Sequence, residues 1–242
     1  MLAIYKREMK AYFITPLGYV FLGVFLLVSG FVFCFTTLYQ MTSDLTEYFS
    51  TMLLCFIILL PLLTMKLFTE EKRARTEQLL LTAPVSVASI VGAKFLAAYT
   101  MFAGSTVFSG LYFIFLSFFG NVQIGLLFGN LLAVLLIGMA FIAVGVFVSA
   151  ITETQLSAAI LTIGVIAAMV GLNLINSLTD SAGEPLIGNY AVRFVLDWFS
   201  VVGRFANFRS GLFDYTSLIY YASLSFVFLF LTVRVYEKRR WG

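Results

Sequence analysis

Six apolar runs, each about as long as a bilayer is thick, constrain this chain more than any other feature of its sequence. A helix needs roughly 20 consecutive apolar residues to cross the hydrocarbon core. The sequence therefore predicts an all-α polytopic membrane protein with six transmembrane helices and a single transmembrane domain over residues 1–242. The predicted spans lie near residues 17–38, 49–68, 93–119, 124–149, 155–177 and 216–236. The first run is long enough to span, so we do not expect it to be a cleaved signal peptide.

Composition agrees with a membrane protein and excludes several kinds of catalysis. Only 11% of the residues are charged, whereas a soluble domain carries about a quarter. The chain has no histidine, which excludes His-based zinc sites, Ser-His triads and histidine proton relays. Its two cysteines, Cys34 and Cys55, lie inside apolar runs and are interpreted as small hydrophobic residues. We therefore expect no catalytic residue and no metal site.

The distribution of charge predicts which way the chain lies in the membrane. An even number of spans places both termini on one face. That face collects twelve of the 15 Lys and Arg residues against six Glu, while the other face has three Arg against six acidic residues. Because Lys and Arg are enriched in cytoplasmic loops, the basic face and both termini are predicted to be cytoplasmic.

The N-terminal residues 1–13 have an amphipathic pattern. Apolar and aromatic residues recur at helical spacing, and the basic residues Lys6, Arg7 and Lys10 take the other side. Such a segment can lie in the headgroup plane before Pro16 starts the first span. A basic flank that only fixes topology is the alternative, and the pattern favours the interfacial helix.

The segment 178–215 before the last span is too long for a simple turn. It carries an apolar stripe opposite a polar stripe, in which Arg193 and Asp197 form an i,i+4 pair. This pattern predicts a helix that dips into the outer interface, or a re-entrant helix shielded by its neighbours.

A polar island at Thr69–Ser89 concentrates charge between two apolar runs. Such a cluster must project into water. Within it, Thr76–Thr82 predicts a short helix that Pro84 ends. A helix with charges at one end and leucines along it fits the groove of a partner protein. A solvated loop is equally compatible with the composition.

The chain shows no energy source of its own. It contains no G-x-x-x-x-G-K-[ST] loop for ATP phosphates and no carboxylate pair inside a span.

Small residues at i,i+4 spacing, such as Gly145 and Ser149, permit close helix approach. Packing between helices of the same chain explains these small residues better than a dedicated interface between two copies.

Residues 68–86, followed by Gly92-Ala93-Lys94-Phe95, resemble the region between the second and third spans of ABC-2-type transporter permeases. The likeness is greatest to gliding-motility-associated permease subunits and extends over essentially the whole chain. One departure is Ala74-Arg75, where relatives often have a glycine before the threonine.

The resemblance implies a non-enzymatic membrane subunit in a bacterial plasma membrane. Its expected partners are two ABC ATPase subunits, which bind ATP and Mg²⁺, and a second permease copy or a sibling permease. An extracytoplasmic accessory subunit is left open, and no cofactor or nucleic acid is expected in this chain. The resemblance implies an ATPase-coupling interface formed by a cytoplasmic coupling helix and a smaller second contact, comprising Glu70, Glu71, Lys72, Arg73, Arg75, Thr76, Glu77, Leu80, Pro84, Thr152 and Glu153.

The predicted function is that of a permease subunit that couples ATP hydrolysis by a separate ATPase to substrate export or extrusion. The alternative is a force-transmitting membrane subunit that acts on an extracytoplasmic partner without solute transport. A standalone membrane enzyme is disfavoured because the chain lacks histidine and clustered intramembrane carboxylates. The sequence does not identify the substrate.

Overall fold

The computed structural model describes residues 1–42, 45–77, 85–118, 120, 124–177, 201, 203, 205 and 214–241, and its elements there are all helices. Six helical segments are long and apolar enough to cross a membrane, which confirms the predicted all-α fold with six spans. In chain order the elements are α1 (Leu2–Ile14), α2 (Pro16–Phe33), η1 (Cys34–Leu38), α3 (Leu45–Thr64), α4 (Lys66–Arg73), α6 (Val87–Leu116), α7 (Ile124–Ile151), α8 (Gln155–Ser177) and α11 (Tyr215–Trp241).

Helix α7 forms the centre of the bundle. It contacts α3, α4, α6, α8 and α11, and its span has the highest mean hydropathy and the largest buried share of the six. Two glycines let its neighbours approach closely. A Cβ at Gly138 would lie 2.0 Å from the Phe102 ring, and one at Gly145 would lie 2.2 Å from Thr64 Oγ1. The spacing of α7 from α6 and α3 therefore depends on these missing side chains.

Aromatic rings fill the interior between α2, α3 and α6. Phe102 is fully buried, and its ring centroid lies 5.3 Å from that of Phe56 and 6.2 Å from that of Phe25. A second cluster further along the bundle contains Phe33, Tyr48, Phe49 and Phe113. Edge-to-face ring pairs of this kind fix the mutual orientation of helices that offer few polar contacts.

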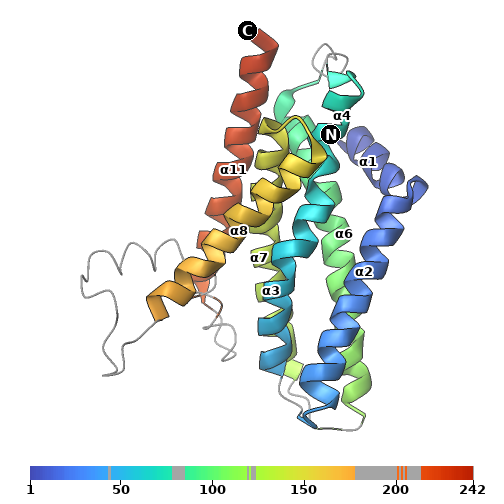
Figure 1. Cartoon of the computed structure of the whole chain (residues 1–242), viewed down its shortest axis with the longest axis vertical. Coiled ribbons are helices and arrows are strands. Elements are labelled where there is room, and N and C mark those ends of the chain that lie inside the picture. The colour runs from blue at the N-terminus through green and yellow to red at the C-terminus, as the bar shows by residue number, and fades with distance from the viewer. Residues whose placement is uncertain are drawn as a thin grey trace.

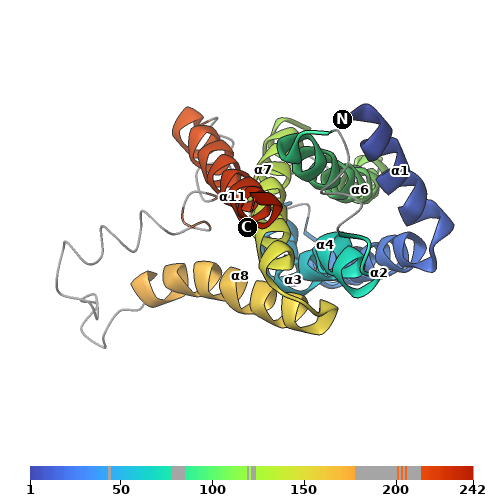
Figure 2. The same cartoon turned by 90° about the horizontal axis from the view of Figure 1, so that it is seen from above.

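Both termini lie at one end of the bundle, as Figure 1 shows. We call this the charged end, and it comprises α1, α4, the first turns of α6, the turn between α7 and α8, and the last turns of α11. Seen from above in Figure 2, α1 crosses this end instead of running along the bundle. It contacts α2 and α6, while α8 diverges from the other helices.

Two predicted features lie outside the six spans: the N-terminal amphipathic helix and the outer helix before the last span. A helix is present at residues 2–14, where the amphipathic segment was predicted. Its position in the headgroup plane stays a prediction. The predicted outer helix falls on residues 178–215, of which the structure describes only 201, 203, 205, 214 and 215.

Candidate functional site

The site begins at the break between α3 and α4, where α7 supplies hydrogen bonds. Pro61 lies in the last turn of α3, and α4 starts directly after Met65. Ser149 Oγ on α7 accepts a hydrogen bond from the Phe68 N–H at 3.1 Å and donates to the Met65 carbonyl at 3.3 Å. A backbone break in an apolar bundle is tolerated only where neighbours pair its polar groups. Ser149 meets that need, so α4 is held on α7.

Lys94, in the second turn of α6, lies at the centre of the charged end. Its side chain is only 2% exposed, and its Nζ lies 2.9 Å from a Glu71 carboxylate oxygen and 3.5 Å from one of Glu8. The same ammonium donates to the Leu67 carbonyl at 2.6 Å and lies 5.1 Å from the centroid of the Phe68 ring. A buried cation requires such compensation. Lys94 thus joins α1, α4 and α6.

Helix α1 adds a second cation to this cluster. Arg7 Nη2 lies 2.8 Å from Glu8 and 3.3 Å from Glu71. Nearby, burial raises the pKa of the Tyr12 hydroxyl, which therefore stays protonated and donates to the Leu63 carbonyl at 3.3 Å. These bonds fix α1 to the junction of α3 and α4.

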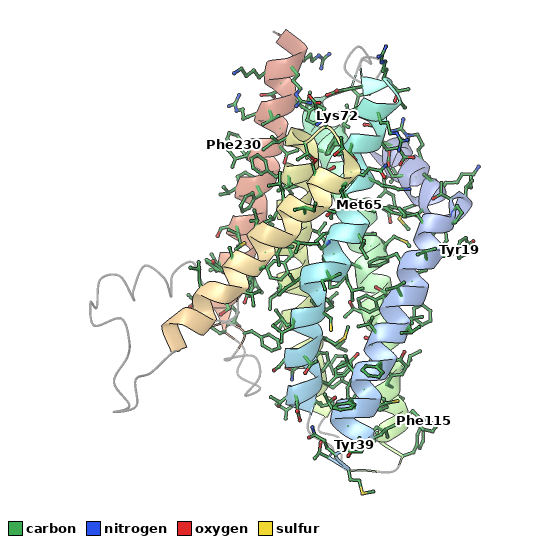
Figure 3. The ribbon with its side chains drawn as sticks, viewed as in Figure 1. Tyr19, Tyr39, Met65, Lys72, Phe115 and Phe230 are labelled. Carbon is green, nitrogen blue, oxygen red and sulfur yellow. The ribbon has the colours of Figure 1, made fainter. Side chains whose placement is uncertain are left out.

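Lys72 connects α4 to the turn between α7 and α8. Its Nζ donates to the carbonyl oxygens of Ser149 at 3.3 Å, Ala150 at 2.5 Å and Thr152 at 2.7 Å. The last carbonyls of a helix have no partner within the helix and carry a partial negative charge. An ammonium is therefore favourable there. Figure 3 shows Lys72 at the charged end, with Met65 further along the bundle.

Helix α4 ends in a Schellman motif. The Thr76 N–H donates to the Glu71 carbonyl at 3.0 Å, and the Arg75 N–H donates to the Lys72 carbonyl at 3.1 Å. Arg75 has φ 55°, the left-handed conformation that glycine adopts most easily. The turn is therefore formed with arginine in a conformation that favours glycine.

The last turns of α11 pack against α4. The Tyr236 and Phe68 rings lie 4.7 Å apart, and the Arg239 guanidinium lies 5.5 Å from the centroid of the Tyr236 ring. Arg239 also forms an ion pair with Glu77 at 3.0 Å. The C-terminal helix therefore contacts the charged segment that follows the second span.

A groove of about 1070 Å³ opens between these elements. Both segments that were predicted to contact a partner line it, although they are far apart in the sequence. Its walls include Thr69, Lys72, Arg73 and Glu77 from the α4 side, Glu153, Thr154, Gln155 and Leu156 from the α7–α8 side, and Arg239 from α11.

The residues of the predicted coupling interface fall into three groups. Those exposed at the charged end are Glu70, Arg73, Arg75, Thr76 and Glu153; those buried or partly buried are Glu71, Lys72, Glu77 and Thr152; and Leu80 and Pro84 lie outside the described residues. The exposed group can meet another protein directly. The buried group makes contacts within the chain.

Sequence reasoning did not assign a role to Lys94, Glu8 or Arg239. One signal for Lys94 was available, because a lone lysine in an apolar helix requires a partner within the protein. The partner's identity could not be read from the sequence, since Glu8 and Glu71 are separated from Lys94 by 86 and 23 positions. In the sequence, Arg239 could not be distinguished from the other basic residues near the C-terminus.

Fold and site together define a polytopic helical membrane protein with a charged end whose elements are joined by side-chain contacts. Among the described residues, no group of His, Cys, Asp and Glu could hold a metal ion. The sequence model of the ABC-2 family transporter protein matches residues 21–182, about two thirds of the chain. The chain therefore belongs to the ABC-2 transporter family, whose members are membrane subunits, generally not themselves catalytic, that associate with ABC ATPase subunits. A comparison with curated proteins finds no match.

Proposed function

We propose that this chain is the permease subunit of an ABC transporter that couples ATP hydrolysis by a separate ATPase subunit to substrate export or extrusion. Its charged end faces the cytoplasm of a bacterial cell and docks the ATPase, which binds ATP and Mg²⁺. Family membership supports the ATPase partner, and the excess of Lys and Arg at this end supports the orientation. Within the family, the likeness of residues 68–86 favours a place near the gliding-motility-associated permeases.

The observation that carries the proposal is the bonding of Lys72 to three carbonyls at the end of α7. It makes one continuous surface from the two segments that the resemblance assigns to ATPase contact. A force applied to α4 is therefore passed directly to α7, the central helix of the bundle. Such a connection suits a subunit that converts movement of an ATPase into movement of its spans.

We assign two kinds of role within this surface. Glu70, Arg73, Arg75, Thr76 and Glu153 are exposed and would contact the ATPase. Glu71, Lys72 and Thr152 would position those residues through bonds within the chain. The complex would contain a second permease copy or a sibling permease, and an accessory subunit outside the membrane is compatible with it.

The first test is purification of the chain from its native membrane in mild detergent, with identification of the proteins that accompany it. An ABC ATPase should co-purify. Reversing two exposed charges, Arg73→Glu with Glu153→Lys, should reduce the ATPase retained by at least about fivefold, because both changes oppose the partner's charges. Lys10→Glu, an exposed reversal on α1 at the same end, is the matched control and should retain the wild-type amount.

Two results would overturn the proposal. One is ATP hydrolysis by the purified chain alone. The other is wild-type ATPase retention and turnover in the double reversal.

Lys72 offers a separate test of positioning. Lys72→Met should leave ATPase retention near wild type, because the exposed contacts remain. ATP turnover of the complex should fall about threefold or more, since the α7–α8 turn loses roughly 1–2 kcal/mol of capping. Equal loss of retention and turnover would instead make Lys72 a direct contact.

A further inference from the structure

The last turns of α11 reach the charged segment at two points. Arg239 pairs with Glu77 at 3.0 Å, and the adjacent Arg240 donates to the Val85 carbonyl at 3.4 Å. Glu77 and Val85 are the described residues that flank positions 78–84. Two consecutive arginines from the C-terminal helix therefore contact both flanks of the segment that carries Leu80 and Pro84 of the predicted interface.

The base of this contact is firmly packed. Tyr236 is 2% exposed and Phe68 is fully buried, and their rings lie 4.7 Å apart. The Arg239 guanidinium also lies over the Tyr236 ring, 5.5 Å from its centroid. Since Phe68 also lies against the Lys94 ammonium, Arg239 is connected to the core of the charged end.

We propose that the C-terminal end of α11 is a clamp that positions the ATPase-coupling segment, with Arg239 and Arg240 as its positioning residues. The proposal rests on the function proposed above. It adds α11 as a third element of the coupling surface, beside α4 and the α7–α8 turn. Movement of the coupling segment is then passed to the last span through Arg239 as well as to α7 through Lys72.

The charges of the pair supply a direct test. In the complex with its ATPase, Glu77→Arg and Arg239→Glu should each lower ATP turnover by about two- to fivefold, the effect of losing a partly exposed ion pair and placing like charges together. The double exchange, Glu77→Arg with Arg239→Glu, recreates the pair in reverse and should restore turnover. Lys238→Glu, a neighbouring exposed residue, is the matched control and should have no effect.

Recovery of ATP turnover in the double exchange would show that Glu77 and Arg239 act on each other, and not that each contacts the ATPase separately. If both single variants match wild type, or if the double exchange is as impaired as the singles combined, Arg239 does not position Glu77 and the proposal is overturned.

A second measurement uses the permease alone. Cysteines replace Glu77 and Arg239 in a chain with Cys34→Ala and Cys55→Ala, and a short bismaleimide is applied to membranes. Efficient cross-linking of this pair supports the contact, and the control pair Glu77→Cys with Lys10→Cys should cross-link little. If the pair cross-links but no ATPase co-purifies, the clamp stands and only the proposed function fails. Absence of the cross-link overturns the clamp, whatever the ATPase does.

Discussion

Lys94 and Phe102 both lie buried on α6, two turns apart, yet they are held in different ways. Lys94 is held by two carboxylates and a backbone carbonyl from α1 and α4. Phe102 packs against the Phe25 and Phe56 rings, and its ring fits beside Gly138 because glycine has no Cβ there. Ion pairs depend on a few directed contacts, whereas ring packing depends on shape and is shared among many atoms.

The contrast bears on how each region serves the protein. At the charged end, five elements meet through individual side chains, so a change at one element is felt by its partners. In the interior, each helix contact is shared among several rings, so its stability does not depend on one side chain. We therefore expect the charged end to transmit movement and the interior to set the spacing of the helices.

The largest effect is expected at Lys94. Lys94→Met removes the buried cation and leaves the Glu8 and Glu71 carboxylates with only Arg7, whose side chain is 56% exposed, as a shared partner. This loss should cost about 3 kcal/mol of unfolding free energy. Unfolding in mixed micelles, with SDS replacing a mild detergent, measures this cost. Lys10→Met, at an exposed lysine of α1, should change it little.

Neutralising the partners sharpens this prediction. Lys94→Met combined with Glu8→Gln and Glu71→Gln should recover much of the loss, because no buried charge is then left unpaired. If Lys94→Met proves as mild as Lys10→Met, the cluster contributes nothing to stability.

The interior should respond to volume instead of charge. Gly138→Ala places a Cβ 2.0 Å from the Phe102 ring, and the repacking should cost about 1–3 kcal/mol. Gly104→Ala is the matched control, because nothing outside its own stretch of helix lies within 4 Å of its added Cβ and alanine is the better helix former by about 1 kcal/mol. The two variants should shift stability in opposite directions. Equal shifts would show that the α6–α7 spacing is not set by Gly138.

The same contrast explains what the sequence could predict. The six spans and the helix at residues 2–14 follow from local pattern, since hydropathy and helical spacing are properties of neighbouring residues. The likeness of residues 68–86 indicated where a partner contact would lie. It could not separate Arg73, which is exposed, from Lys72, which bonds to α7, because that difference depends on residues 149–152.

Two details show where local reasoning stops. A short helix was predicted at Thr76–Thr82, of which the structure describes only Thr76 and Glu77. The preceding charged residues lie in a helix of their own, Lys66–Arg73, which continues the second span beyond the break at Met65. Gly145 and Ser149 were expected to serve packing within the chain. In the structure, Gly145 contacts Thr64 and Ser149 bonds to Phe68, so both residues pack against the junction of α3 and α4. The i,i+4 spacing alone does not predict this contact.

The smallest effect is expected at the end of α4. Arg75 adopts φ 55° within a Schellman motif, a conformation that costs a non-glycine residue about 1 kcal/mol. Arg75→Gly should therefore raise the unfolding free energy by up to about 1 kcal/mol, reduced by the greater freedom of glycine in the unfolded chain. Ala74→Gly is the matched control: Ala74 has φ −77°, so glycine gains nothing there and should destabilise.

Arg75 also tests the division between contact and positioning. Arg75→Ala and Arg75→Gly both remove the guanidinium, but only glycine relieves the backbone. If the side chain contacts the ATPase, both variants should lower ATPase retention equally, while only Arg75→Gly gains stability. If retention instead follows stability, and Arg75→Gly retains more ATPase than wild type, then the shape of the turn is what the partner recognises. Arg75 would then belong with Lys72, as a residue that shapes the surface without forming the contact.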